Sequence, residues 1–459
     1  MSTDTPTSTA YLGIDVSRDE LACCLVLSDG SRASPGWVVA NDPAGMDALV
    51  RQTVELVGQH SVGQLLLGME ASGLYWWHPA CLLVDSPALQ PFEAQVYALN
   101  PRVVRGFERA CSPRSKTDPN DAHLIAERLR FGQLPAPFRV DPAYAPLQRL
   151  TRYRKHVADN LVREKCYYLS LLTLSYSAYC QQRPLGTHPL SATGIAVLEE
   201  FTAEQVAAMP IGELTEFVQR AGHGKFKQPQ QVAAKLKQAA SDSYELPEHL
   251  AEPVKLVLQE TLGQIRRLQA QLARLDKLVE KQLAQLPEHL RTIRSIPGLG
   301  GVYTAGIVAE LGDVTRFPDD AAIAKYAGLW WPARESGSYQ AQDTPMSKAG
   351  NEYLRYHLVE AANSVRLHCA EYQQYYAAKH AQSTKHAHKR AVVLTARKLV
   401  RLIDELLRAG KVIPSPQPRR EAGMDPAAYR QTRQAPGRAA GAQARKASGH
   451  SGDVTARVR

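Results

Sequence analysis

Along its first third, the chain alternates between hydrophobic patterns that are typical of strands and patterns that are typical of helices. The stretch YLGIDVSRDELACCLVL predicts two strands joined by a tight polar turn, and RASPGWVVA, QLLLGME and AQVYAL predict three more. Helices are predicted over 43–57, where apolar residues recur at helical spacing, and in ASGLYWWHPACLLV and DPNDAHLIAERLRFG. Strands that lead and helices that cover them predict a mixed α/β domain over residues 11–135.

Residues 142–289 are predicted to be helical, with two long helices. The first, over about 146–180, is strongly basic. The second, over about 254–286, carries apolar residues on alternating three- and four-residue steps, or sums of them: Leu258, Ile265, Leu268, Leu272, Leu275, Val279 and Leu286. This seam predicts a coiled coil of about four heptads, which would pack against the first helix or join two chains. Residues 182–250 form an irregular insert to which the sequence assigns no role.

After Pro287 the pattern predicts a separate helical domain, over residues 290–410. The remaining residues, 411–459, are rich in Ala, Gly, Pro, Gln and Arg and lack hydrophobic periodicity. From residue 415 onward they hold nine Lys or Arg and three Asp or Glu. We expect a disordered basic tail, either an arm that binds a partner or an extension without a role.

Composition narrows the partners and the compartment. Lys and Arg outnumber Asp and Glu by 55 to 45, for a net charge of +10, which favours a polyanionic partner such as nucleic acid. No apolar run approaches the roughly 18 residues of a membrane helix, and the start, MSTDTPTSTA, does not resemble a secretory signal. The seven cysteines show no CxxC spacing, so we expect reduced thiols in a cytoplasmic protein.

Two carboxylates are candidates because of their places in strands. Asp15 stands between Ile14 and Val16 in the first apolar strand, where an unpaired buried charge would be costly and a metal ion would satisfy it. Glu70 ends the strand QLLLGME, a usual place for a catalytic group in α/β folds. Alternatively, Asp15 faces solvent and Glu70 is an ordinary residue at a strand end.

Two further carboxylates, Asp118 and Asp121, lie three residues apart at the start of a predicted helix and share one of its faces. Asp118 precedes Pro119, so it is also a natural helix N-cap, and Asp121 would complement the helix dipole. Capping and metal binding are compatible, because a capping carboxylate keeps oxygen lone pairs for an ion.

The four carboxylates together are more informative than any one of them. An early strand Asp, a later strand-end Glu and an Asp-x-x-Asp at a helix start form the layout of ribonuclease-H-like nucleases. Their carboxylates hold two divalent ions, about 3.5–4 Å apart, that act on a phosphodiester. Hard oxygen ligands favour Mg²⁺ or Mn²⁺ over zinc.

The C-terminal domain adds its own motifs. IRSIPGLGGVYTAGIVAELGD predicts a helix-hairpin-helix, in which Gly298 and Gly300 allow a tight turn whose N–H groups approach phosphate; a plain corner between helices is the alternative. Ser336, in a Ser/Gly loop, would act as a nucleophile if a base or metal activated it. The candidate nucleic-acid contacts are Arg149, Arg152, Arg154, Lys155, Gly298, Gly300, Lys348 and Arg355.

The order of these motifs resembles that of a known family. GIDVS, GMEASG, SKTDPNDA, IPGLG, KYAGL, ESG and SKAGNEYLR occur as in the DEDD transposases of insertion-sequence family one hundred and ten, relatives of the Piv/MooV DNA invertases. The resemblance covers about 11–131 and 290–408. It implies a bacterial recombinase with a RuvC-like N-terminal domain, guided by a structured RNA that pairs with donor and target DNA.

The resemblance also implies roles for single residues. Asp15, Glu70, Asp118 and Asp121 match the acidic tetrad that binds the metal ions, and Ser336 matches the serine that joins covalently to a DNA strand end. The basic helix near Arg149 would contact the guide RNA, mainly through its phosphates. In this chain Trp330 and Trp331 shift Pro332 one place from the usual Gly-Leu-x-Pro, which leaves Ser338 and Ser347 as alternative nucleophiles.

The sequence therefore predicts a transposase that cleaves and rejoins DNA with a serine and two metal ions. Because the tetrad and Ser336 are far apart in sequence, the site would be assembled from two domains, within one chain or between the subunits of a dimer or tetramer. Two alternatives remain open: a hydrolytic nuclease or junction resolvase, in which water attacks, and a nucleic-acid-binding transposase derivative without activity.

Overall fold

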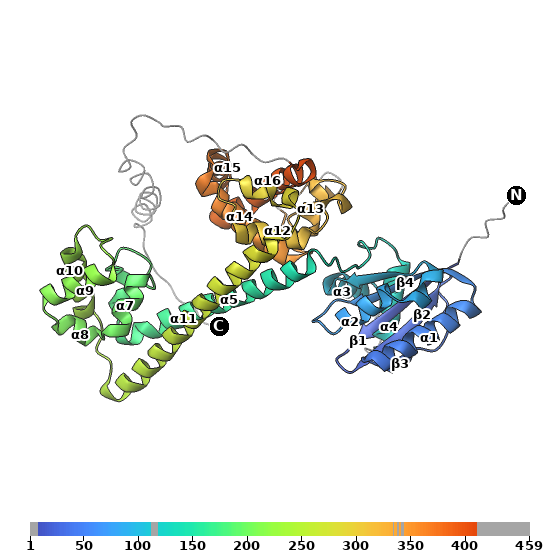
Figure 1. Ribbon diagram of the computed structural model, residues 1–459, viewed down its shortest axis with the longest axis horizontal. Coiled ribbons are helices and arrows are strands. Elements are labelled where there is room, and N and C mark those ends of the chain that lie inside the picture. Colours follow the sequence, from blue (N-terminus) through green and yellow to red (C-terminus); the bar gives the residue numbers. More distant parts are fainter. Residues whose placement is uncertain (1–7, 112–117, 334, 337–338, 341–343, 411–459) are drawn as a thin grey trace, which may run out of the picture. The chain divides into compact units, whose positions relative to one another are not determined.

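The computed structural model describes residues 8–111, 118–333, 335–336, 339–340 and 344–410. The predicted basic tail, residues 411–459, lies outside the described residues. Within them, no helix is long and apolar enough to cross a membrane. The N-terminal part is a mixed α/β sheet and the rest is almost entirely helical, as the hydrophobic patterns predict (Figure 1).

A five-stranded mixed sheet forms the N-terminal part, with the order β3-β2-β1-β4-β5. The central strand β1 pairs antiparallel with β2 and parallel with β4, and β4 pairs parallel with β5. The five predicted strands correspond to β1 (Ser8–Val16), β2 (Glu20–Leu27), β3 (Trp37–Ala40), β4 (Val62–Glu70) and β5 (Gln95–Leu99). The helices of this part are α1 (Pro43–Gln59), α2 (Trp77–Val84), η1 (Pro87–Phe92), α3 (Pro101–Ala110) and α4 (Asp118–Arg130).

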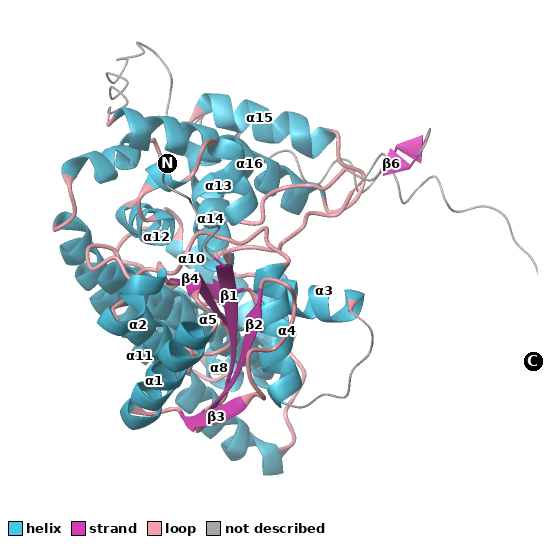
Figure 2. Cartoon of the chain, turned by 90° about the vertical axis from the view of Figure 1, so that its right-hand side faces the viewer, coloured by secondary structure: helices cyan, strands magenta, loops and turns pink. Residues whose placement is uncertain are grey.

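Alternation of side chains along β1 and β4 gives the sheet two different faces. Leu12 and Ile14 of β1 pack in one core with α1, whereas Ala122 and Ala126 of α4 pack on the opposite face with alternate residues of β2. Figure 2 shows α1 and α4 on opposite sides of the sheet. The sheet is therefore a central layer between helices, and on the second face α4 is joined by Val104 of α3.

Helix α4 lies unusually close to β1. A Cβ atom at Gly13 would overlap the backbone of Ala122 and Ala126, and one at Gly68 would stand 2.9 Å from the side chain of Leu129. The two glycines occupy paired positions on the neighbouring strands β1 and β4. The absence of side chains at this pair of positions is what allows the helix to approach the sheet.

Two long helices, α5 (Ala145–Ser175) and α11 (Glu248–Ala284), lie side by side (Figure 1). They run antiparallel, because Arg154 near the start of α5 pairs with Asp276 near the end of α11. Ile265, Leu268 and Leu275 of the predicted seam are buried in the same core as Val157 and Leu161 of α5. The seam is thus covered at least in part within the chain, and it gives no argument for a contact between two chains.

The insert between these helices is itself helical and shares their core. Its helices are α6 (Ser177–Gln182), α7 (Ala192–Glu200), α8 (Ala203–Ala208), α9 (Ile211–Ala221) and α10 (Pro229–Ser241). Val197, Val206, Leu214 and Leu236 join the core of α5 and α11. The sequence pattern was too irregular to predict these short helices, two of which begin at polar N-caps, Ser191 for α7 and Thr202 for α8.

The C-terminal domain consists of short and medium helices around α14. Its elements are η2 (Glu288–Ser295), α12 (Gly301–Leu311), η3 (Val314–Arg316), α13 (Asp320–Tyr326), β6 (Glu335–Ser336), β7 (Tyr339–Gln340), α14 (Glu352–His368), α15 (Ala370–Ala381) and α16 (Ala387–Ala409). Leu354, Leu358, Ala362 and Val365 are buried, so α14 presents one apolar face to the core of this domain.

A histidine lies in the core of this domain. His357 of α14 is 1% exposed, its ring lies against Gly306 of α12, and neither ring nitrogen has a hydrogen-bond partner in the described part of the chain. Burial, together with the positive charges of Arg154 and Lys155 on α5, lowers the pKa of His357 to about 3. The imidazole is therefore neutral and acts as a packing group at neutral pH.

We expect Gly13→Ala to lower the stability of the N-terminal domain, because the new methyl group forces α4 away from β1. The loss should be about 3 kcal/mol in the free energy of unfolding, measured by urea denaturation, and amide hydrogen exchange should accelerate in α4. Gly106→Ala in α3 is the control, since a Cβ there meets nothing within 4 Å. Equal stability of the two variants would contradict the close packing of α4.

Acid should destabilise the C-terminal domain through His357. The unfolded chain binds a proton at this histidine near its ordinary pKa of about 6.5, whereas the folded chain does so only near pH 3. The free energy of unfolding therefore falls as the pH drops below about 6.5, by up to ~1.4 kcal/mol per pH unit. Urea denaturation at several pH values measures how steeply the free energy of unfolding falls with pH. This dependence should be weaker in His357→Phe than in the unaltered protein, and it should be unchanged in His249→Phe, at an exposed position of α11.

Candidate functional site

Asp15 and Glu70 come together at one edge of the sheet. The parallel register pairs Ile14 of β1 with Met69 of β4, so the next residues, Asp15 and Glu70, stand at the carboxyl ends of neighbouring strands. Both are half-buried. Because side chains alternate, each points to the same face as the glycine two residues before it, the face that α4 covers.

The direction of α4 places its first turn at this edge. Arg130, the last residue of α4, lies against Gly30, which follows the end of β2 where Leu27 pairs with Ala10 near the start of β1. The helix consequently ends near the start of β1 and begins near its carboxyl end. Asp118 is the first residue of α4 and Asp121 lies in its first turn, so the helix start faces the edge that carries Asp15 and Glu70.

The ends of β1 and β4 and the start of α4 bring carboxylate residues to one edge of the sheet, and carboxylate oxygens suit a cation that prefers oxygen ligands. Among the side chains that the structure describes, no three His, Cys, Asp or Glu residues form a group that could hold a metal ion. The side chain of Asp118 lies outside that set. The tetrad as a metal site therefore stays a prediction.

The basic residues of α5 are largely engaged within the chain. Arg152 Nε and Nη2 donate to the two carboxylate oxygens of Glu310, at 2.7 and 2.8 Å. Arg154 pairs with Asp276 at 2.5 Å, and Lys155 with Asp159 at 2.6 Å. Of these predicted nucleic-acid contacts, Arg152 holds α5 to α12 and Arg154 holds it to α11, whereas Lys155 pairs within α5. Arg149, the fourth, is exposed.

The Gly-rich turn of the predicted helix-hairpin-helix joins the 3₁₀ helix η2 to α12. Gly298 has a positive φ of 90° and lies against α14, where Ser364 Oγ donates a hydrogen bond of 2.7 Å to its carbonyl. Gly300 precedes α12, and a Cβ there would meet nothing within 4 Å. Gly298 is thus favoured as glycine by its positive φ and by its close contact with α14. Gly300 is the position of this turn that has open space around it.

Ser336 lies in a short hairpin, in which it pairs with Tyr339. Its side chain and those of its neighbours lie outside the described set, as does the alternative Ser338. Of the third candidate, Ser347, the backbone N–H donates to Trp330 O at 3.0 Å, and the side-chain Oγ accepts from Ala349 N at 3.3 Å. Ser347 is therefore held by hydrogen bonds where the chain returns from the Ser336 hairpin to Trp330.

Arg355 holds the two ends of the segment that carries Ser336. Its Nη1 donates to Ala327 O at 3.0 Å and to Lys348 O at 3.1 Å, and burial lowers the pKa of this guanidinium. Lys348 is exposed and has a positive φ of 54°. Of the two predicted nucleic-acid contacts here, Arg355 binds backbone within the chain and Lys348 presents its side chain to solvent.

The sequence analysis missed Glu310, the acidic centre of the helical part. Its side chain is 0% exposed and accepts hydrogen bonds from Arg152, from Gln148 Nε2 at 3.3 Å and from Asn351 Nδ2 at 2.7 Å. Asn351 in turn caps the start of α14. The signal was a glutamate within the apolar run GIVAELG, the kind of buried charge that requires a partner.

Comparison with known proteins identifies relatives of both ends of the chain. A family model described as "Transposase", DEDD_Tnp_IS110, matches residues 12–177, and the model of the transposase IS116/IS110/IS902 family matches residues 290–377. The chain is 26% identical over 315 residues to the uncharacterized 44.8 kDa protein of insertion element IS116 from Streptomyces clavuligerus, covering 67% of this chain and 75% of that protein. It is 24% identical over 180 residues to the pilin gene-inverting protein of Moraxella lacunata, covering 37% and 50% of the two chains.

Among solved structures, RuvC of T. thermophilus in complex with a Holliday junction substrate is similar at 18% identity, covering 28% of this chain and 99% of that one. The TM-score of 0.22 is too low to carry an argument, so the sheet is described by its own strand order. The family models are the stronger finding, because together they span more than half of the chain and follow each other in the expected order. The chain belongs to the IS110 family of insertion-sequence transposases.

Proposed function

We propose that this transposase cleaves and rejoins DNA with a metal-bound acidic tetrad and a serine nucleophile, guided by an RNA that its element encodes. The observation that carries the proposal is the parallel register that sets Asp15 beside Glu70, with the start of α4 at the same edge. We also assign the sheet to the ribonuclease-H-like class. Its central strand β1 has the antiparallel strand β2 on one side and the parallel strands β4 and β5 on the other.

The donor set fits divalent metal ions with oxygen ligands. Asp15, Glu70, Asp118 and Asp121 supply carboxylates from two strand ends and one helix start. Four carboxylate residues at one edge of the sheet would repel each other without a cation, which favours Mg²⁺ or Mn²⁺ there. Two such ions, when bound, would increase the reactivity of the attacking oxygen and stabilise the charge on the leaving oxygen.

In the proposed reaction, Ser336 Oγ loses its proton and forms a bond to the phosphorus of a DNA phosphodiester. The bond from phosphorus to the DNA oxygen breaks, and that oxygen takes up a proton to leave as a hydroxyl. A hydroxyl of the partner strand then attacks the phosphoserine and releases the serine. The phosphorus keeps two ester bonds at every stage, because each step forms one as it breaks another, so no high-energy cofactor is needed to rejoin the strands.

The tetrad and Ser336 belong to different parts of the chain, so the proposed site is composite. We propose that exposed cations, among them Arg149 and Lys348, contact the phosphates of DNA or guide RNA, with the open turn at Gly300 as a further contact. A dimer or tetramer would let the tetrad of one subunit act with the serine of another.

Asp15→Asn should abolish strand cleavage while leaving the fold intact, because the substitution removes a metal-binding charge but keeps the size of the side chain. We expect the rate to fall on the order of a thousandfold, the scale of losing a group that stabilises transition-state charge. Recombination of donor and target plasmids that carry the cognate element measures it. Asp19→Asn, an exposed position paired with Arg18 on the turn after β1, is the matched control and should retain activity. Full activity of Asp15→Asn would exclude the metal role.

Ser336→Ala should abolish the covalent protein–DNA adduct, because it removes the attacking oxygen. Adducts trapped in denaturant and digested with protease should yield a single phosphoserine peptide by mass spectrometry, at Ser336. Ser347→Ala is the control within the same segment and should still form adducts. If Ser336→Ala continues to cut DNA without forming an adduct, water is the nucleophile and the enzyme is a hydrolytic nuclease. If no variant and no metal concentration gives cleavage, the chain is a binding protein derived from a transposase.

A further inference from the structure

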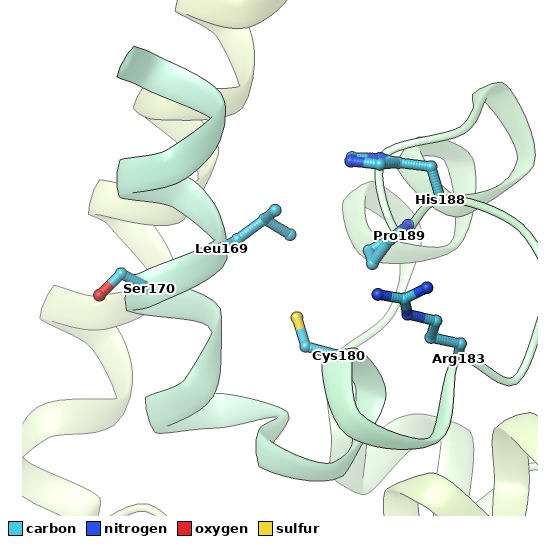
Figure 3. A pocket seen from close by; sticks show the side chains of 6 residues that line it. All are labelled: Leu169, Ser170, Cys180, Arg183, His188 and Pro189. Carbon is cyan, nitrogen blue, oxygen red and sulfur yellow. The ribbon is translucent and has the colours of Figure 1, made fainter. Parts of the chain in front are cut away.

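A cleft of about 470 Å³ lies between α5 and the segment that follows it, far in sequence from both the tetrad and Ser336. It is lined by Leu169, Ser170, Cys180, Arg183, His188 and Pro189. Figure 3 shows that the side chains of Leu169, Cys180, Arg183 and His188 converge on it, while Ser170 points away from the others on its rim. Its size falls in the range of about 300–1,000 Å³ that is typical of ligand pockets.

Two donors of this cleft have capacity for an anion. Arg183 is exposed, and none of the hydrogen bonds or ion pairs of the described residues uses its guanidinium. The Nδ1 atom of His188 accepts a hydrogen bond of 3.1 Å from the Leu190 N–H, so the neutral ring carries its proton on Nε2 and presents it as a donor. Arg183 also has a positive φ of 47°, an uncommon conformation for a residue with a side chain.

The rest of the cleft is apolar and uncharged. Leu169 and Pro189 face each other across it (Figure 3). Burial raises the pKa of the Cys180 thiol, so this group adds no negative charge at neutral pH. Two donors beside two apolar surfaces suit a ligand with an anionic group and a flat, weakly polar body.

An exposed face of α5 beside the cleft indicates which ligand this is. Tyr153, His156, Arg163, Tyr167 and Ser170 follow one another at spacings of three, four or seven along α5, and all are exposed. The rings of Tyr153 and His156 stack, with centroids 6.2 Å apart, and none of the described ion pairs involves Arg163. Alternating aromatic and basic side chains are a surface for single-stranded nucleic acid. This stripe ends at Ser170, which borders the cleft although its side chain points away from it (Figure 3).

We propose that the cleft holds one unpaired nucleotide of a nucleic acid strand that follows α5. Its phosphate would lie on Arg183 and His188, and its base would lie between Leu169 and Pro189. Unpaired bases are commonly turned out of a strand into such apolar slots. The inference rests on the proposed handling of nucleic acid by this chain, but not on the chemistry of Ser336.

The test uses alkylation of Cys180 by iodoacetamide, followed residue by residue with mass spectrometry on the full chain. Each variant is compared with itself, with and without AMP, because Arg183 affects the thiol pKa. We expect saturating AMP to slow alkylation of Cys180 at least about fivefold and to leave Cys81, in the N-terminal domain, unchanged. Arg183→Ala and His188→Ala should each raise the half-protecting AMP concentration by about tenfold, the scale of a hydrogen bond to a charged group. Arg220→Ala, which removes an exposed cation elsewhere in the insert, should not.

Further arms identify the source of the nucleotide. Short oligoadenylates of RNA and of DNA should protect Cys180 at lower concentrations than AMP does. The one that protects at the lower concentration identifies the binding strand as RNA or DNA. Protection by inorganic phosphate as strong as that by AMP would overturn the nucleotide assignment. Protection by AMP but by neither oligoadenylate would overturn the assignment to a strand. Running the assay in Ser336→Ala protein keeps the result independent of recombination, since that variant should show the same protection.

Discussion

The buried carboxylate of Glu310 is the interaction on which the helical part of this transposase depends. It lies on α12 with no exposure to solvent, and it binds Arg152 of α5 through two hydrogen bonds and Asn351 through one. A buried charge without partners would cost several kcal/mol, so these three segments must meet for the carboxylate to be satisfied. The position of α12 against α5 is therefore set by charge pairing in addition to apolar packing.

The same interaction reaches the segment that carries Ser336. Asn351 binds Glu310 with its amide nitrogen and uses its amide oxygen to cap α14, while its backbone N–H donates to Tyr326 O at 2.7 Å. One turn later, Arg355 binds the carbonyls of Ala327 and Lys348. Both ends of the segment are thus fixed to α14, and α14 is fixed through Glu310 to α5. A nucleophile on such a segment would be positioned by the helices, because the secondary structure of its described residues is limited to the short paired strands β6 and β7.

The sequence predicted those features that depend on local pattern. Alternation and short apolar runs located all five strands, and the positions of Asp15 and Glu70 near strand ends followed from that pattern alone. The pairing of these two strands is not local, and only the register shows that the carboxylates are neighbours. The basic residues of α5 were predicted to contact nucleic acid. The pairing of two of them with Asp276 and Glu310 could not be predicted, because these carboxylates lie more than a hundred residues further along the chain.

The coiled-coil seam is a second case in which a local pattern does not identify the partner. Its heptad pattern predicted a partner helix correctly, but a seam is equally satisfied by a helix of the same chain or of another one. Burial against α5 now accounts for at least part of it, and α5 has only its opposite, aromatic and basic, face left for a partner. Assembly of a composite active site would then have to come from surfaces other than this seam. The outer face of α5 is better suited to a polyanion, since a second copy of the same face would bring the charge of Arg163 against a like charge.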